Sequence, residues 1–183
     1  MVLSHRGTVI RTDDLTKLPL RSAFIEQLTA ALEIAGATGQ PVSLLVIDID
    51  LFKLVNDTFG HLQGDRVLIE IADLLRQNLR SDDLAARYAG DELVALLPNT
   101  PADRAREVAE RLCAAVRGHA FQVRDRDDKL SVSISIGVAT SPENGSDPDA
   151  LFAAADRALY QVKRHGRDGV AVAAAGAGES GHL

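Results

Sequence analysis

The chain has 183 residues, of which 46% are hydrophobic, and its formal net charge at pH 7 is −6. This length favours one domain with a substantial core, and the acidic balance argues against a nucleic-acid binder, which needs a basic face. The only cysteine, Cys113, lies in a helical pattern as a core residue, which excludes a disulfide framework and a cysteine-rich metal site. No apolar run is long enough to span a membrane, and the N-terminus lacks the apolar region of a signal peptide, so we expect a cytoplasmic protein.

Hydrophobic periodicity predicts an alternation of helices and strands. Apolar residues three and four apart indicate helices, a continuous apolar run that ends in acids indicates a buried strand, and strict alternation with serine indicates a period-two strand. In chain order the predicted elements are a helix over 24–35, a buried central strand over 41–50, a helix over 67–79, a hairpin with arms near 84–88 and 93–97, a helix capped by Thr100 that runs to about Gly118, a strand over 130–138, and a helix that starts at Asp147-Pro148. This order fits an antiparallel or mixed sheet with helices packed on it, in the α/β (α+β) class.

The two ends of the chain are assigned outside the domain. Residues 1–12 show no strong period and are interpreted as a linker. The domain is assigned to 13–172, and residues 173–183 are interpreted as a flexible tail after a short strand at most.

Four acids are predicted to meet at one end of the sheet. Asp48 and Asp50 close the buried strand, and Asp91 and Glu92 stand on the predicted hairpin tip, Ala89-Gly90-Asp91-Glu92. If the hairpin is the neighbour of that strand, the carboxylates converge, and hard oxygen ligands of this kind suit Mg2+. A magnesium site with few protein ligands completes its shell with water and substrate phosphates. The alternative interpretation is that these are ordinary strand-end and turn acids.

The segment between these acids, DIDLFKLVNDTFGHLQGD, has the residue types of a nucleotide-binding loop. Lys53 can stabilise phosphate charge, and two glycines let the backbone approach a ligand closely. Asn56 and Asp65 can bind a base edge, because a carboxylate has two acceptor oxygens that match the adjacent donors of guanine, which adenine lacks. Taken singly, Lys53 is an ordinary surface lysine and His61 a turn histidine, so the prediction rests on the combination.

Taken together, the motifs of this chain resemble the GGDEF domain of diguanylate cyclases. The resemblance covers residues 13–172 and rests on DDLTKLPLRSAF, DIDLFKLVNDTFGHLQGD, RYAGDEL, SVSISIGVA and ADRALYQVKRHGRDGV. It implies a mostly antiparallel sheet flanked by helices, the ferredoxin-like fold of nucleotide cyclases and polymerase palms. It also implies a bacterial signalling enzyme that joins two GTP molecules into cyclic di-GMP, with release of pyrophosphate, on two facing domains of a homodimer. The implied cofactor is Mg2+ or Mn2+.

The resemblance also implies a role for each residue that matches the family motifs. The metal would be held by Asp48, the Ile49 carbonyl and Asp91. Asp91 or Glu92 would help to deprotonate the attacking 3′-hydroxyl, and Lys53 would stabilise charge on the phosphates. The residues implied to bind GTP are Phe52, Asn56, His61, Asp65, Gly90, Lys163 and Arg167. An inhibitory RxxD site for the product is implied at Arg80, Asp83 and Arg111.

The chain departs from the family pattern at a few positions. The double glycine of the family motif is Ala89-Gly90 here, which gives AGDEL with Leu93 in place of phenylalanine, and Lys17 and Leu20 replace a glycine and an asparagine. A positive φ at position 89 would cost alanine roughly 1–2 kcal/mol, whereas a negative φ would cost little. Because Gly90 and both acids are retained, we expect a weakened rather than an inactive tip. The alternative function is a catalytically silent domain that binds cyclic di-GMP or GTP and signals by contact.

Overall fold

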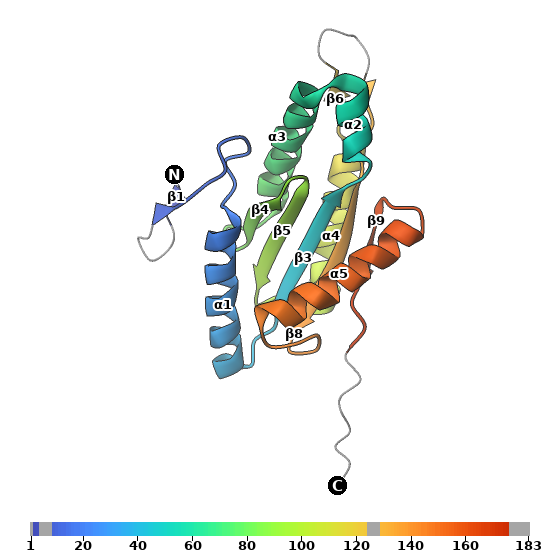
Figure 1. Ribbon diagram of the computed structural model, residues 1–183. Coiled ribbons are helices and arrows are strands. Elements are labelled where there is room, and N and C mark those ends of the chain that lie inside the picture. The colour runs from blue at the N-terminus through green and yellow to red at the C-terminus, as the bar shows by residue number, and fades with distance from the viewer. Residues whose placement is uncertain (1, 4–8, 124–128, 176–183) are drawn as a thin grey trace.

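A computed structural model describes residues 2–3, 9–123 and 129–175 of the chain. Its centre is a five-stranded sheet with the strand order β4-β5-β3-β8-β9 (Figure 1). The bounds of these strands are β3 Val42–Ile49, β4 Leu84–Ala89, β5 Glu92–Pro98, β8 Ile134–Ser141 and β9 Gly169–Val172. β8 and β9 run parallel, whereas the other neighbours run antiparallel, so the prediction of a mostly antiparallel sheet is confirmed.

Helices cover both faces of this sheet (Figure 1). One face packs against α1 (Arg21–Thr38) and α5 (Pro148–Arg164), and the other against α3 (His61–Asn78) and α4 (Ala102–Gly118). The short helix α2 (Phe52–Phe59) follows the end of β3. Two small two-stranded ladders lie outside the sheet, and they pair β1 (Val2–Leu3) with β2 (Val9–Ile10) and β6 (Phe121–Gln122) with β7 (Lys129–Leu130).

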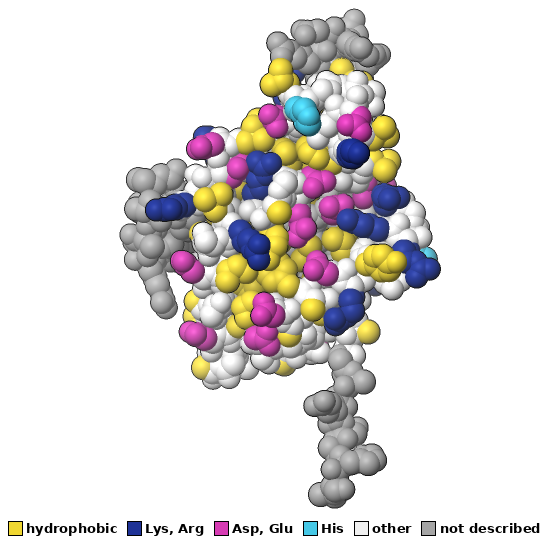
Figure 2. All heavy atoms as spheres, viewed as in Figure 1, with side chains coloured by type: hydrophobic (Ala, Val, Ile, Leu, Met, Phe, Trp, Pro, Cys, Tyr) yellow, Lys and Arg dark blue, Asp and Glu magenta, His cyan; other side chains and the backbone are white. Residues whose placement is uncertain are grey.

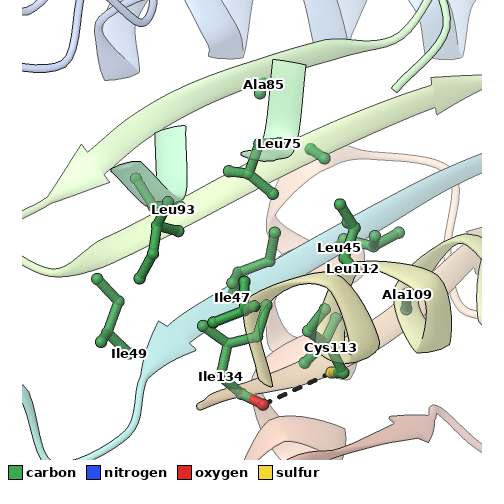
Figure 3. Packing of buried hydrophobic residues seen from close by; sticks show 14 of the residues in the cluster. Leu45, Ile47, Ile49, Leu75, Ala85, Leu93, Ala109, Leu112, Cys113 and Ile134 are labelled. Carbon is green, nitrogen blue, oxygen red and sulfur yellow. Dashed lines mark hydrogen bonds between the residues drawn. The ribbon is translucent and has the colours of Figure 1, made fainter. Parts of the chain in front are cut away.

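The central strand β3 is buried on both faces, which explains its continuous apolar sequence. Leu45, Ile47 and Ile49 pack on the α3 and α4 side, as Figure 3 shows. Leu44 and Val46 pack on the α1 and α5 side. The alternation fixes which face every other residue of the strand uses.

Two residues singled out in the sequence lie in this core (Figure 3). Leu93 is fully buried and lies directly across from Ile47 in the β3–β5 ladder, so the leucine fills the position of the family phenylalanine. Cys113 is buried, its thiol donates to the Ile134 carbonyl at 3.5 Å, and burial raises the pKa of this thiol to about 12. The prediction that Cys113 packs in the core is confirmed.

Two predictions of local structure are wrong. The Thr100 hydroxyl donates to the Pro98 carbonyl at 2.8 Å and caps no helix, because α4 begins at Ala102 with Pro101 before it. The strand predicted over 130–138 is interrupted, and β8 starts only at Ile134. Every residue of β8 is buried, because Ile134, Ile136 and Val138 pack on the α3 and α4 side and Gly137 and Ala139 on the α1 and α5 side.

The predicted nucleotide-binding loop is also corrected. Residues 52–59 form the helix α2, and α3 begins at His61 rather than near 67. Gly60, with φ 85°, lies between the two helices and allows the chain to turn sharply. The predicted loop is therefore a pair of helices joined at one glycine.

The segment before α1 is tied to the hairpin. In its turn, Lys17 has φ 58°, in the left-handed region that favours the glycine of the family pattern. Asp13 accepts hydrogen bonds from the backbone and hydroxyl of Thr16 and forms an ion pair with Arg87 at 3.0 Å. Arg87 also donates to the Gly90 carbonyl at 2.9 Å, so one side chain connects the turn to the hairpin tip.

At the other end of the domain, the first two residues after β9 still form hydrogen bonds with β8 and with the turn that follows it. The Ala173 N–H donates to the Val138 carbonyl, and the Ala174 carbonyl accepts from Asn144. Residues 176–183 of the predicted tail lie outside the described residues. Among the helices that are described, none combines the length and the apolar composition needed to cross a membrane.

Candidate active site

The predicted convergence of acids depends on the neighbour of β3, and that neighbour is the hairpin strand β5. In the antiparallel register Glu92 lies directly across from Asp48. Directly paired residues project from the same face of a sheet, and here it is the face against which α5 packs. The hairpin tip and the end of β3 therefore lie at one end of the sheet, as predicted.

The backbone at the hairpin tip settles the question of Ala89. Among the described residues, the non-glycine positions with positive φ are Lys17, Leu51, Asn99, Arg167 and Asp168. Ala89 is the last residue of β4 and is exposed, whereas Gly90 after it has φ 39°. Ala89 therefore has no positive φ, and alanine at this position costs little backbone energy.

The acids at this end of the sheet surround one lysine. Lys163, in the last turn of α5, lies 2.8 Å from Asp48. Burial raises the pKa of Asp48, and the nearby Asp91 raises it further, whereas Lys163 opposes the shift. Burial also raises the pKa of Glu92, with further contributions from Asp156 and Asp48. The two carboxyls therefore hold protons more tightly than in water, which is the effect of burial and of neighbouring like charges.

Asp156 is the member of this group that sequence reasoning missed. It lies on α5, and burial raises the pKa of its carboxyl while Lys163 lowers it. The sequence did contain a signal for Asp156. It lies seven residues before Lys163, which is about two helical turns, so the two residues share one face of α5. Figure 2 shows acidic and basic side chains intermingled on the molecular face that α5 crosses.

Asp50, which the sequence grouped with these acids, has different partners. Its carboxylate accepts hydrogen bonds from the Ser133 and Ser135 hydroxyls, both at 2.7 Å, and from the backbone N–H of Asp168 at 3.0 Å. Its own N–H donates to the Ser133 carbonyl at 3.0 Å. Asp50 therefore connects the end of β3 by hydrogen bonds to β8, to the residue before it and to the turn after α5.

The oxygen atoms at the end of β3 and on the tip fit a hard divalent cation. Because the Asp50 N–H points toward β8, the backbone groups of Ile49 point to the opposite side, toward the hairpin and beyond the last β3–β5 pair. The Ile49 carbonyl thus points toward the hairpin that carries Asp91. Among the described residues no three His, Cys, Asp or Glu side chains form a metal cluster.

The α2–α3 pair carries the residues predicted to bind the base. Asn56 is half-buried on α2, and its side chain lies against Gly64 of α3, the residue before Asp65. A Cβ at Gly64 would lie 1.9 Å from Asn56 Oδ1 and 3.1 Å from Phe52 Cζ. This glycine therefore makes room for the Asn56 side chain, whereas the glycines of this segment were predicted to allow close approach of a ligand.

The remaining predicted site residues of this segment lie near the helix ends. Lys53 is exposed in the first turn of α2. His61 is exposed at the first residue of α3, directly after Gly60. Both side chains are open to solvent, so they are accessible to a ligand.

The turn between α5 and β9 presents the second predicted phosphate contact, Arg167. Gly166, Arg167 and Asp168 have φ values of 110°, 67° and 49°, so three consecutive residues are left-handed. For the two non-glycine residues this conformation costs of order 1–3 kcal/mol each and persists only where the surroundings enforce it. Here Asp168 forms a two-point ion pair with Arg117, at 2.7 and 2.8 Å, and Arg167 N–H donates to the Val162 carbonyl at 3.0 Å.

The residues of the predicted inhibitory site lie together, away from the acids. Asp83 accepts from the backbone N–H of Arg80 at 2.9 Å, and Arg111 donates to the Asn78 carbonyl at 2.7 Å. Burial raises the pKa of Asp83, and both arginines oppose that shift by their charge. Since Asp83 directly precedes β4 and the tip follows it, the two sites are separated by the strand, roughly 20 Å at about 3.3 Å per residue.

A mostly antiparallel sheet with acids converging at one end, and with a helix pair and basic residues around them, defines a domain of the nucleotide-cyclase type. The family model described as "Diguanylate cyclase, GGDEF domain" matches residues 10–169. The chain belongs to this family.

Two curated relatives are close in sequence. The chain is 44% identical to the response regulator PleD of Caulobacter vibrioides over 168 residues, which are 92% of this chain and 37% of PleD. It is also 44% identical to the diguanylate cyclase DgcP of Pseudomonas aeruginosa over 162 residues, 88% of this chain and 24% of DgcP. The chain thus spans about a third or less of these relatives.

Solved structures agree with the fold. The GGDEF domain of TpbB (YfiN) from Pseudomonas aeruginosa superposes with a TM-score of 0.85 at 38% identity, covering 90% of this chain and 95% of that one. The GGDEF domain of DgcB from Caulobacter crescentus, solved in complex with c-di-GMP, has a TM-score of 0.83 at 32% identity and covers 90% of this chain and 98% of its own.

Proposed function

We propose that the chain is a diguanylate cyclase that condenses two GTP molecules into cyclic di-GMP and releases pyrophosphate. The observation that carries this proposal is the position of Glu92 directly across from Asp48, with Lys163 at 2.8 Å from Asp48 and the Asn56-bearing helix pair following the same strand. The named activity of the relative DgcP supports the same reaction.

The acids and the metal have separate tasks in this proposal. Asp48, Asp91 and the Ile49 carbonyl would hold Mg2+ or Mn2+, which when bound supplies charge stabilisation on the phosphates. Glu92 is the better placed of the two tip acids to accept the proton of the 3′-hydroxyl, because its raised pKa brings it closer to the operating pH. Asp91 then acts mainly as a metal ligand.

The substrate is held from three sides. Asn56 and Asp65 bind the guanine edge, with Phe52 and His61 beside it. Lys53 on α2, together with Lys163 and Arg167 at the end of α5, neutralises the triphosphate. Gly90, which has open space where a Cβ would stand, leaves room at the tip for the phosphates.

Catalysis requires two copies of the chain, because each domain offers one guanine-binding pair and the product contains two guanosines. Two domains must therefore face each other as a homodimer. Specific activity should rise with enzyme concentration across the range in which light scattering shows monomers becoming dimers. A constant specific activity for the monomer would contradict this arrangement.

The replacement Asp91→Asn tests the proposed reaction. It removes one charged ligand and leaves the core intact, so cyclic di-GMP formation from GTP and Mg2+ should fall below detection while the circular dichroism spectrum is unchanged. The matched control is Asp103→Asn, at an exposed acid in the first turn of α4, which should retain full activity. Undiminished product from folded Asp91→Asn protein would refute the assignment. If the wild type binds nucleotide but forms no cyclic di-GMP, the alternative of a catalytically silent signalling domain is favoured.

We further propose that Arg80, Asp83 and Arg111 bind the product and inhibit the enzyme. The clustering of two arginines around a half-buried carboxyl supports this, since arginine forks onto phosphate and a carboxylate accepts the paired donors of guanine. Calorimetry should show cyclic di-GMP binding that Arg80→Ala strongly reduces. Arg106→Ala, on the exposed surface of α4, is the matched control. Equal binding by Arg80→Ala and the wild type would reduce the motif to a surface turn.

A further inference from the structure

We propose that Asp50 is a positioning residue: it holds the turn between α5 and β9 so that Lys163 and Arg167 face the triphosphate of GTP. The inference rests on the proposed cyclase function, and it separates Asp50 from the metal-binding role of Asp48. The two aspartates occupy one short motif, DID, yet they have different partners.

The surroundings of Asp50 are those of a structural anchor. The residue is 7% exposed, and its two oxygens accept three hydrogen bonds, one at Oδ1 from Ser135 and two at Oδ2 from Ser133 and from the Asp168 N–H. Within the described part of the chain, no lysine or arginine forms an ion pair with it. Three donors directed at one buried carboxylate fix its position through hydrogen bonds alone.

The turn that Asp50 holds has a backbone that does not persist unaided. Gly166, Arg167 and Asp168 are all left-handed, and Arg167 is exposed, with its own N–H donating to the Val162 carbonyl. Asp168 is held twice, by Asp50 at its N–H and by Arg117 at its carboxylate. These contacts fix the backbone at Arg167 and Asp168, and thereby the point from which the exposed Arg167 side chain extends.

The DID motif at the end of β3 contacts the end of α5 and the turn that follows it at two points. Asp48 contacts Lys163 in the last turn of α5, and Asp50 contacts Asp168 five residues later in the chain. Both side chains leave β3 on the face that α5 covers, as the buried Ser135 beside Asp50 does from β8. The end of β3 thereby places both basic residues of the α5–β9 connection relative to the acids.

A metal-ligand role for Asp50 would require different geometry. Oδ2 already accepts two hydrogen bonds, so a cation on that oxygen would displace one of its donors, and the one lone-pair site left on the carboxylate is at Oδ1, beside the bond from Ser135. Loss of a donor would free the turn that carries Arg167. The geometry therefore assigns Asp50 to the turn.

The test is a comparison of ligands with and without the outer phosphates. Calorimetry with Mg2+ measures binding of 3′-deoxy-GTP, which cannot condense, and of GMP to the wild type, to Asp50→Ala, to Arg167→Ala and to the double variant. We expect Asp50→Ala to weaken 3′-deoxy-GTP by about tenfold or more, a change of about 1.4 kcal/mol per factor of ten, and GMP by about twofold or less. In the Arg167→Ala background the added effect of Asp50→Ala should shrink to about threefold or less, since coupled residues are not additive.

Other outcomes discriminate the alternatives. Equal weakening of both ligands, or full additivity with Arg167→Ala, would overturn the positioning role. Recovery of affinity at high Mg2+ would instead identify Asp50 as a metal ligand. Hydrogen exchange at the Asp168 amide should be faster in Asp50→Ala, and unchanged protection would also contradict the inference. A wild type that binds neither nucleotide would refute the proposed function itself, while the exchange measurement still decides the role of Asp50 in the turn.

A milder variant keeps the test usable if Asp50→Ala does not fold. Ser133→Ala removes one of the two bonds to Oδ2 and leaves the carboxylate in place. It should lower affinity for 3′-deoxy-GTP in the same direction but by a smaller factor, with GMP unaffected. A Ser133→Ala protein that loses affinity for both ligands equally would contradict the proposal.

Discussion

Gly64 is the residue whose replacement most directly tests the proposed binding of guanine by the α2–α3 helix pair. An alanine Cβ at this position would lie 1.9 Å from Asn56 Oδ1, 2.9 Å from Asn56 Cγ and 3.1 Å from Phe52 Cζ. The first two atoms belong to the end of a flexible side chain, so Asn56 can rotate away while the backbone of both helices stays in place. We therefore expect Gly64→Ala to fold and to bind GTP poorly.

The two expected magnitudes differ. Alanine in place of glycine within a helix stabilises by up to about 1 kcal/mol, and a displaced Asn56 rotamer costs about 0.5–1.5 kcal/mol, so stability should change by no more than roughly 1 kcal/mol. A buried hydrogen-bonding contact that is lost costs about 1–3 kcal/mol, which corresponds to GTP binding weaker by roughly 5- to 150-fold.

Urea denaturation measures the first quantity and calorimetry with 3′-deoxy-GTP and Mg2+ the second. Gly36→Ala is the matched control, because this helical glycine of α1 has nothing within 4 Å of the added Cβ. It should leave GTP affinity unchanged. Wild-type GTP affinity in Gly64→Ala would refute the reasoning. A loss of more than about 3 kcal/mol in the free energy of unfolding would also refute it, because it would show that the Asn56 side chain cannot move aside.

Three further predictions follow from backbone and charge. Lys17→Gly should raise the free energy of unfolding in urea by about 0.5–1 kcal/mol, because φ 58° at Lys17 is strained, whereas Lys17→Ala should give no gain. Ala89→Gly should leave cyclase activity equal or higher, since it removes only an exposed methyl; a large drop would show that the alanine is fitted to this site. The raised pKa of Glu92 means that the folded state binds its proton more tightly than the unfolded state, so thermal stability in EDTA should fall as pH rises from about 4.5, and Glu92→Gln should lack part of this fall. A parallel decline in both proteins would contradict that last expectation.

The arrangement of the sheet could be predicted because strand patterns carry it. A continuous apolar run must be buried on both faces, and a hairpin beside it fixes the register that places Glu92 across from Asp48. The helix α2 could not be found the same way, because in eight residues only Val55 is buried and no stripe is long enough to show a period.

Side-chain partners were the other limit of sequence reasoning. Asp48 and Asp50 are the same residue type two positions apart, and their roles diverge only through groups distant in the chain. Asp50 meets Ser133 and Asp168, which are 83 and 118 positions away. No local pattern encodes which distant donor arrives at which carboxylate. Asp156 was different, since its helical spacing to Lys163 was readable and could have added it to the site.

The hairpin tip is best understood from the acids that the fold holds together, rather than from the alanine that replaces a glycine. Like charges directly opposite each other in an antiparallel ladder are destabilising, and Glu92 stands opposite Asp48 with Asp156 approaching from α5. Burial raises the pKa of all three carboxyls, and Lys163 is the neighbouring charge that opposes each shift. An apolar pair at the end of this ladder would stabilise the sheet more. The methyl of Ala89, exposed on an ordinary strand backbone, imposes no comparable strain. The energetic cost at this end of the sheet is therefore concentrated in the groups that we propose to bind a cation and accept a proton.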